Sequence, residues 1–110
     1  MANTFTRKLQ RGIGTTAQEI GSYTVPSATT TIVVGLTVTN TSGSAITANV
    51  YVNDGVANTY VVSNAPISSG ASLVPIGGDQ KLVLITGDKV YVQSSASSSI
   101  DAILSIMEIT

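Results

Sequence analysis

Residues Thr31 to Asn40 read TIVVGLTVTN, and this stretch gives the clearest indication of the fold. Apolar and polar side chains alternate along it, which is typical of a β-strand that buries one face. The side chains expected on one face are Ile32, Val34, Leu36 and Val38, with Thr37 and Thr39 on the other.

A second alternating run follows after a short turn. Residues Thr41 to Ser44 read TSGS, and the run from Ala45 to Asn53 begins directly behind them. In that run the apolar positions are Ile46, Ala48, Val50 and Val52. Because so short a turn separates the two runs, we expect them to pair with each other as antiparallel strands.

Similar short runs continue along the chain, and Gly, Pro or Asp residues separate them. The expected strands are Glu19–Val25, Thr31–Asn40, Ala45–Asn53, Asn58–Ser63, Ser72–Ile76, Gln80–Ile85, Lys89–Ser94 and Ile100–Ile109. About eight short strands at near-regular spacing predict an all-β fold, an antiparallel β-sandwich or jelly roll over residues 15–110.

The composition agrees with a single all-β domain. The chain has 110 residues, of which 43% are hydrophobic and only 10% charged, and the apolar residues are mostly branched at Cβ. Such side chains pack well on a pleated sheet. The absence of Cys and His excludes disulfides, thiol catalysis, zinc fingers and catalytic triads with a His base. No stretch approaches the roughly 18 apolar residues of a membrane-spanning helix.

Residues 1–14 differ from the rest and are predicted to form an arm. Phe5, Leu9 and Ile13 recur every four residues, which would place them near one face of a short helix. So short a helix is not stable alone in water, so we expect order only against a partner or against the domain itself. The basic side chains between these positions are Arg7, Lys8 and Arg11.

The last expected strand, Ile100–Ile109, is apolar on both faces. Its two sets of apolar residues are Ile103, Met107 and Ile109 on one face, and Ala102, Leu104 and Ile106 on the other. Two explanations remain open: the strand is central and covered on both sides, or one face meets another subunit.

No constellation of residues marks a catalytic, cofactor or metal site. The six carboxylates are Glu19, Asp54, Asp79, Asp88, Asp101 and Glu108, and three of the aspartates stand beside Gly in expected turns. Turn formation accounts for those aspartates, and we predict no enzyme. The basic arm is either a solvated tail or a protein-docking segment, with nucleic acid the least favoured partner, since two or three phosphate contacts bind only weakly.

Four tyrosines offer one further alternative. Tyr23, Tyr51, Tyr60 and Tyr91 could line a sugar-binding face. Tyr51 and Tyr91 fall opposite the main apolar stripes and are candidates for exposure. We favour partial burial or an inter-subunit contact for these rings.

Several motifs between Glu19 and Glu108 resemble a family of small virion proteins of tailed bacteriophages. They are LTVTNTSGSAIT (36–47), API (65–67) followed by SG (69–70), KLVL (81–84) followed by TGDKV (86–90), and IMEI (106–109). The basic start RKL (7–9) is similar to cyanophage members. The resemblance implies a β-sandwich of the decoration or neck-collar type, present in repeated copies, and it implies no catalytic residue.

The sequence therefore predicts a non-enzymatic virion structural protein, either a capsid decoration (cement) protein or a head-to-tail neck or collar component. It would act by oligomeric assembly and by bridging to other virion proteins, such as major capsid or neck and tail proteins, with assembly in the host cytoplasm. The alternative is a receptor- or glycan-binding module of a tail fibre or spike. The predicted interface residues are Phe5, Arg7, Lys8, Leu9, Arg11, Met107 and Ile109.

Overall fold

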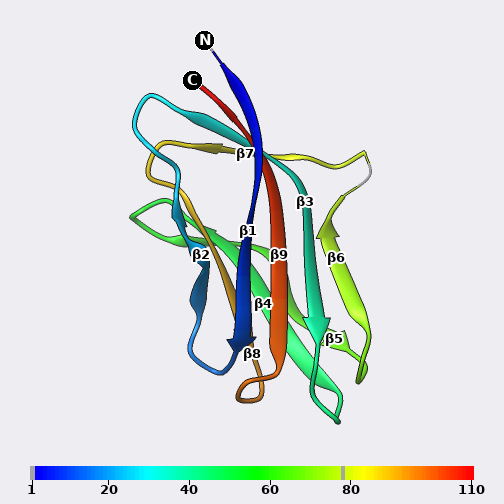
Figure 1. Cartoon of the computed structure of the whole chain (residues 1–110). Coiled ribbons are helices and arrows are strands. Elements are labelled where there is room, and N and C mark those ends of the chain that lie inside the picture. The colour runs from blue at the N-terminus through cyan, green and yellow to red at the C-terminus, as the bar shows by residue number, and fades with distance from the viewer. Residues whose placement is uncertain (1, 78) are drawn as a thin grey trace.

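The computed structural model describes residues 2–77 and 79–110, and within these ranges the chain forms nine β-strands and no helix (Figure 1). The strands are β1 (Asn3–Ile13), β2 (Gln18–Thr24), β3 (Thr30–Asn40), β4 (Ile46–Asn53), β5 (Asn58–Ile67), β6 (Ser72–Ile76), β7 (Leu82–Ile85), β8 (Lys89–Ser94) and β9 (Ile100–Ile109). The prediction of an all-β fold is confirmed.

Two antiparallel sheets make up the sandwich. The first sheet has the order β1-β9-β3-β6, and β7 also pairs with β3; the second has the order β2-β8-β4-β5. Figure 1 shows β1, β9 and β3 running side by side down the molecule, with the two chain ends together at one end. β9 is therefore central in its sheet, bordered by β1 and β3.

The core lies between the sheets and consists mainly of β-branched and Leu side chains. The largest fully buried ones are Ile13, Ile20, Leu36, Ile76, Leu84, Ile100, Leu104, Ile106, Val25, Val33, Val38 and Val50. On β4 the buried side chains Ile46, Ala48 and Val50 alternate with half-buried ones, as predicted.

The predicted pairing of Thr31–Asn40 with Ala45–Asn53 is wrong. β3 pairs with β9, β6 and β7, whereas β4 pairs with β5 and β8 in the other sheet. Asn40 explains the crossover, because its buried side-chain amide donates to the carbonyls of Ser44 (2.8 Å) and Ile67 (3.0 Å). These bonds bend the chain from one sheet to the other instead of closing a hairpin.

The predicted faces of β3 also need a correction. The register against β9 shifts between Val33 and Gly35, so Val34 is an extra residue in a β-bulge. A one-residue shift exchanges the two faces of a strand. Val33 and Leu36 therefore both point into the core, and Ile32 points to the outer face of the sheet.

The helix expected in residues 1–14 is also wrong, because this segment contains the edge strand β1. A spacing of four residues is also a multiple of the two-residue strand period, so Phe5 and Leu9 share one face of the strand. β1 pairs with β9 from Asn3 to Ile13, and Ile13 is fully buried in the core. The role of the segment as a docking arm stays a prediction.

One strand is longer than expected. Pro66 lies within β5 rather than ending it. β5 is an edge strand of the second sheet, a position where the missing N–H of proline is tolerated.

Candidate assembly surface

The outer face of the first sheet carries a continuous row of apolar side chains across four strands. Phe5 on β1 lies opposite Met107 on β9, and Met107 lies opposite Ile32 on β3. Ile32 in turn lies opposite Val83 on β7. Side chains directly opposite each other in a sheet are neighbours on the same face. The four residues therefore form one row perpendicular to the strands.

Further apolar groups flank this row on the same face. Ile109 and Ile85 belong to the next row towards the chain ends, joined through Thr30. Towards the other end, Leu9 lies opposite Ile103. We call the set the apolar face, and it consists of Phe5, Leu9, Ile32, Val83, Ile85, Ile103, Met107 and Ile109.

Four members of the apolar face are largely exposed to solvent. The exposed fractions are 72% for Phe5, 61% for Val83, 63% for Ile85 and 47% for Ile103. Full side chains of this kind present on the order of 150–200 Å², so these four alone expose about 400 Å². A contiguous apolar patch of that size on a small domain commonly marks an interaction site.

Small and basic residues separate the apolar rows. Ser105 on β9 lies between Ile103 and Met107 and pairs with Arg7 on one side and Gly35 on the other. Because Ser105 and Gly35 are small, the middle of the face is lower than the apolar rows beside it, and Arg7 borders it on β1.

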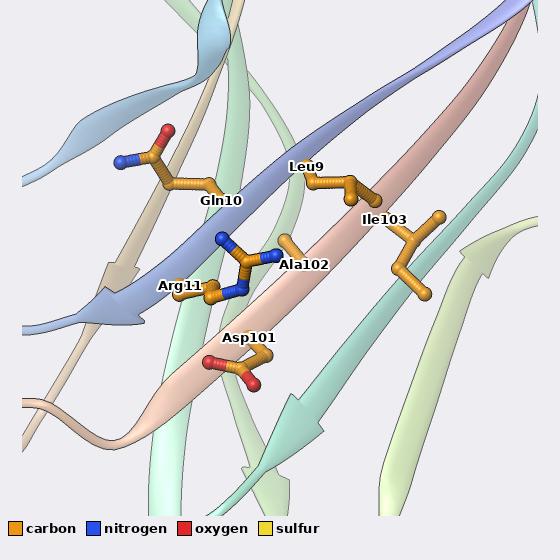
Figure 2. Close-up of a pocket in the computed structure, with 6 residues that line it drawn as sticks. All are labelled: Leu9, Gln10, Arg11, Asp101, Ala102 and Ile103. Carbon is orange, nitrogen blue, oxygen red and sulfur yellow. The ribbon is translucent and has the colours of Figure 1, made fainter.

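A shallow hollow opens at the far end of β1. Its volume is about 160 Å³, and Leu9, Arg11, Asp101 and Ile103 contribute to its wall (Figure 2). The backbone N–H of Gly12 donates to Oδ1 of Asp101 at 3.1 Å. Small-molecule sites usually have volumes of roughly 300 Å³ or more. The hollow is smaller than that, so we interpret it as an ordinary depression in the surface of this sheet.

The register brings together six of the seven predicted interface residues. They are Phe5, Arg7, Leu9, Arg11, Met107 and Ile109, which all lie on the outer side of the first sheet. Lys8 points the other way, because its neighbour in the register is the buried Leu104. Its Nζ lies 5.2 Å from the centroid of the Tyr23 ring, where β1 approaches β2.

The three basic residues of β1 consequently do not converge. Arg7 and Arg11 lie on one side of the strand and Lys8 on the other. A nucleic acid backbone on this side of the strand would contact two separated cations, and two such contacts supply little binding free energy.

Four members of the apolar face were not among the predicted interface residues: Ile32, Val83, Ile85 and Ile103, although Ile103 was expected on the same strand face as Met107 and Ile109. Ile32 was assigned to the core because the bulge at Val34 leaves no mark in the pattern. In LVLI (82–85) only Leu84 is fully buried, and four apolar residues in succession show no alternation that would reveal which ones face solvent.

The carboxylates in the turns act as expected. Oδ1 of Asp54 accepts from the N–H groups of Val56 (2.9 Å) and Ala57 (3.0 Å), and Oδ2 of Asp88 accepts from the N–H of Ile85 (3.0 Å). The bonds from Ala57 and then Val56 hold the pKa of Asp54 below its usual value.

The described part of the chain contains neither a metal-ligand cluster nor a membrane-spanning helix. Residues 2–77 and 79–110 contain no group of three or more acidic, His or Cys side chains placed to hold a metal ion. The same residues include no helix with the length and hydropathy needed to cross a membrane.

Solved structures of other proteins share the β-sandwich fold of this chain. No family model matches the chain. No curated protein matches it either. A solved structure of Bacillus endospore appendages, described as a novel family of disulfide-linked pili, is 16% identical with a TM-score of 0.57, and the match covers 99% of this chain and 87% of that one.

Two further solved structures share the fold. A chain of the IBDV viral particle is 15% identical with a TM-score of 0.59, and the match covers 96% of this chain but only 30% of that one. The nucleoplasmin-like N-terminal domain of Drosophila FKBP39 is 12% identical with a TM-score of 0.52, with coverages of 98% and 91%. At these identities the likeness defines the fold class, a two-sheet β-sandwich.

Proposed function

We propose that the chain is a non-enzymatic structural subunit of a bacteriophage particle, and that it assembles with copies of itself through the apolar face. The observation that carries the proposal is the apolar row of Phe5, Met107, Ile32 and Val83, in which the two end residues are exposed and the two middle ones half-buried. Water in contact with such a row is released when a second surface covers it, and that release drives association.

The size of the face suits a stable contact. β1 has 11 residues, and four strands spaced about 4.8 Å apart give a face of roughly 20 Å by 35 Å, on the order of 700 Å². Stable protein interfaces bury about 800 Å² per partner. One sheet face of this chain can therefore supply most of an interface.

The charge of the chain does not oppose self-association. Its net charge is −1, and only 10% of its residues are charged. Copies of the chain therefore repel each other weakly. On the face itself, the charged side chains are Arg7, Arg11 and Asp101, so an interface would bury few charges.

The assignment to a phage particle is supported by the sequence motifs between Glu19 and Glu108. It is also supported by a fold that a viral particle uses. The specific roles we propose are capsid cement or a neck or collar piece, with major capsid or neck and tail proteins as partners. Assembly would take place in the host cytoplasm and leave the protein in the virion.

Light scattering after size exclusion tests the assembly. We expect the full chain to form a defined homo-oligomer, and the double variant Phe5→Ser, Val83→Ser to be monomeric with an unchanged circular dichroism spectrum. The matched control is Val56→Ser, because Val56 is 90% exposed but lies in the turn between β4 and β5. A wild-type monomer, or a double variant that keeps the oligomer, would refute the proposed contact.

Co-sedimentation with empty phage capsids or with host cells tests which of the two the protein binds. We expect the protein to sediment with empty phage capsids and not with host cells. Sedimentation with the cells alone would overturn the cement, neck or collar role and favour a receptor-binding module of a tail fibre or spike.

A further inference from the structure

The outer face of the second sheet differs from the apolar face and carries a row of tyrosines. Tyr60 on β5 lies opposite Tyr51 on β4, and Tyr51 lies opposite Tyr91 on β8. The ring centroids of Tyr51 and Tyr60 are 5.1 Å apart, and those of Tyr51 and Tyr91 are 5.3 Å apart. We call these three residues the tyrosine row. Glu19 on β2 ends it, opposite Tyr91.

The row is rigid and partly open to solvent. The rings of Tyr51 and Tyr91 are nearly parallel, at 19°, and support each other. Tyr60 is tilted by 47° from Tyr51 and is 51% exposed, so it presents the most open ring of the three. A tyrosine side chain has few rotatable bonds, and a ligand therefore loses little free energy in ordering such a surface.

Planar amides lie on both sides of the tyrosine row. The side-chain amide of Asn53 donates to that of Asn58 at 2.8 Å, next to Tyr51 and Tyr60. On the other side, the amide of Asn49 donates to that of Gln93 at 3.3 Å. Each amide group retains a further N–H or a free lone pair, so both pairs can bind additional hydroxyl groups.

The charges at the end of the row neutralise each other. Oε1 of Glu19 lies 3.5 Å from Nζ of Lys89 and accepts a hydrogen bond of 3.4 Å from the hydroxyl of Tyr91. An anionic ligand such as a nucleic acid or a phosphate would find a cation already paired with a carboxylate. The surface therefore suits a neutral ligand that carries both C–H groups and many hydroxyls.

We propose that the tyrosine row and its amides form a carbohydrate-binding surface. The C–H face of a sugar ring would pack on the open ring of Tyr60, because the π-electron face of an aromatic ring is negative and C–H hydrogens are weakly positive. Sugar hydroxyls would exchange hydrogen bonds with the amides of Asn53 and Asn58. The surface lies on the opposite sheet from the apolar face, so this proposal does not depend on the assembly proposed above.

Affinity electrophoresis tests the proposal with three neutral soluble polysaccharides: dextran, mannan and galactan. We expect at least one of these gels to retard the protein, and Tyr60→Ala to weaken the retardation at least tenfold. Tyr60→Phe keeps the ring and should keep most of the binding. Val74→Ala shortens a side chain that is 59% exposed on β6 of the other sheet and lies outside the apolar face, so it is the control, with no expected change.

Tyrosine fluorescence gives an independent signal. The chain has four tyrosines and no tryptophan, and three of the four are in the row. Titration with the retarding polysaccharide should therefore change the intrinsic emission of the wild type and of Val74→Ala, but not that of Tyr60→Ala.

Three results would overturn the carbohydrate site. The first is free migration in all three gels, and the second is retardation that survives in Tyr60→Ala. The third is dissociation of the homo-oligomer in Tyr60→Ala, because the row would then be a contact between copies of the chain. The first two results do not bear on the apolar face, whose own test uses Phe5 and Val83.

Discussion

The hydroxyl of Tyr23 on β2 donates a 2.7 Å hydrogen bond to Oε2 of Glu108 on β9, and so joins the two sheets. The same hydroxyl lies 2.7 Å from Oγ1 of Thr31, which is fully buried on β3. Burial is the main reason why the pKa of Tyr23 rises from 10.0 to about 12. The bond with Thr31 lowers this pKa, and Glu108 raises it through its hydrogen bond and its charge.

We predict that Tyr23→Phe lowers the free energy of unfolding at pH 7 by about 1–3 kcal/mol. The substitution keeps the ring but leaves the buried Thr31 hydroxyl and the Glu108 carboxylate without this partner. Urea denaturation followed by circular dichroism measures the loss. A variant as stable as the wild type would show that these bonds contribute nothing net.

The same substitution should change the pH dependence of stability. Between pH 10 and about 12 the folded protein keeps the Tyr23 proton, whereas the unfolded chain releases it. The stabilisation is therefore fully present below pH 10 and is lost as the pH rises through this window, by roughly 2–3 kcal/mol. Tyr23→Phe should show a smaller fall over the same range, and equal falls in both proteins would contradict the assignment.

A second prediction separates the part of β1 that stabilises the domain from the part that is free to bind. Ile13 is fully buried, whereas Leu9 is only half-buried on the outer face. Ile13→Ala should cost about 2–5 kcal/mol of unfolding free energy. Leu9→Ala should cost less than about 1 kcal/mol. Urea midpoints of the two variants give the comparison. Similar losses would mean that Leu9 and Ile13 contribute equally to the stability of the domain.

Gly21 supplies a third prediction, because β2 approaches β1 most closely there. Its φ is +62°, and an added Cβ would lie 2.9 Å from Cβ of Lys8. Gly21→Ala should therefore cost about 2–3 kcal/mol, through both backbone strain and the clash with β1.

Two other glycines separate the two causes. At Gly55 the φ is +91° but nothing lies within 4 Å of an added Cβ, so Gly55→Ala tests backbone strain alone, at about 1 kcal/mol. Gly43 has neither feature, and Gly43→Ala should change stability by less than about 0.5 kcal/mol. Thermal unfolding ranks the three variants, and a Gly21→Ala loss no larger than that of Gly55→Ala would exclude the clash.

Local patterns made the strands predictable but not their partners. Alternation along β4 depends only on which face of the strand is buried, so it is visible in the sequence. The bulge at Val34 is not visible, because an extra residue among apolar neighbours leaves the composition of the run unchanged. The spacing of Phe5 and Leu9 fits both a strand and a helix, and only the open edge of β9 decides between them.

The candidate surfaces depend on register even more strongly. Met107 was predicted as a possible interface residue, since β9 is apolar on both faces, and it is half-buried. That Ile32 and Val83 continue its row follows from the pairing of β3 with β9 and β7, which are far apart in the sequence. The three tyrosines were recognised as a group, but only the pairing of β4 with β5 and β8 places Tyr51 between Tyr60 and Tyr91.

The last prediction concerns Asn40, which directs the chain from the first sheet to the second. Besides the two bonds that its amide donates, its Oδ1 accepts from the N–H of Ser42 (2.9 Å) and from the Ser42 hydroxyl (2.7 Å). Asn40→Ala removes the partner of the Ser42 N–H and one donor to each of the carbonyls of Ser44 and Ile67, although the Ser42 hydroxyl still lies 2.9 Å from the Ser44 carbonyl. It should lower the free energy of unfolding by about 2–4 kcal/mol. The exposed Asn58 is the control, and Asn58→Ala should lose less than about 1 kcal/mol. Urea denaturation measures both, and equal losses would mean that Asn40 does not hold the crossover.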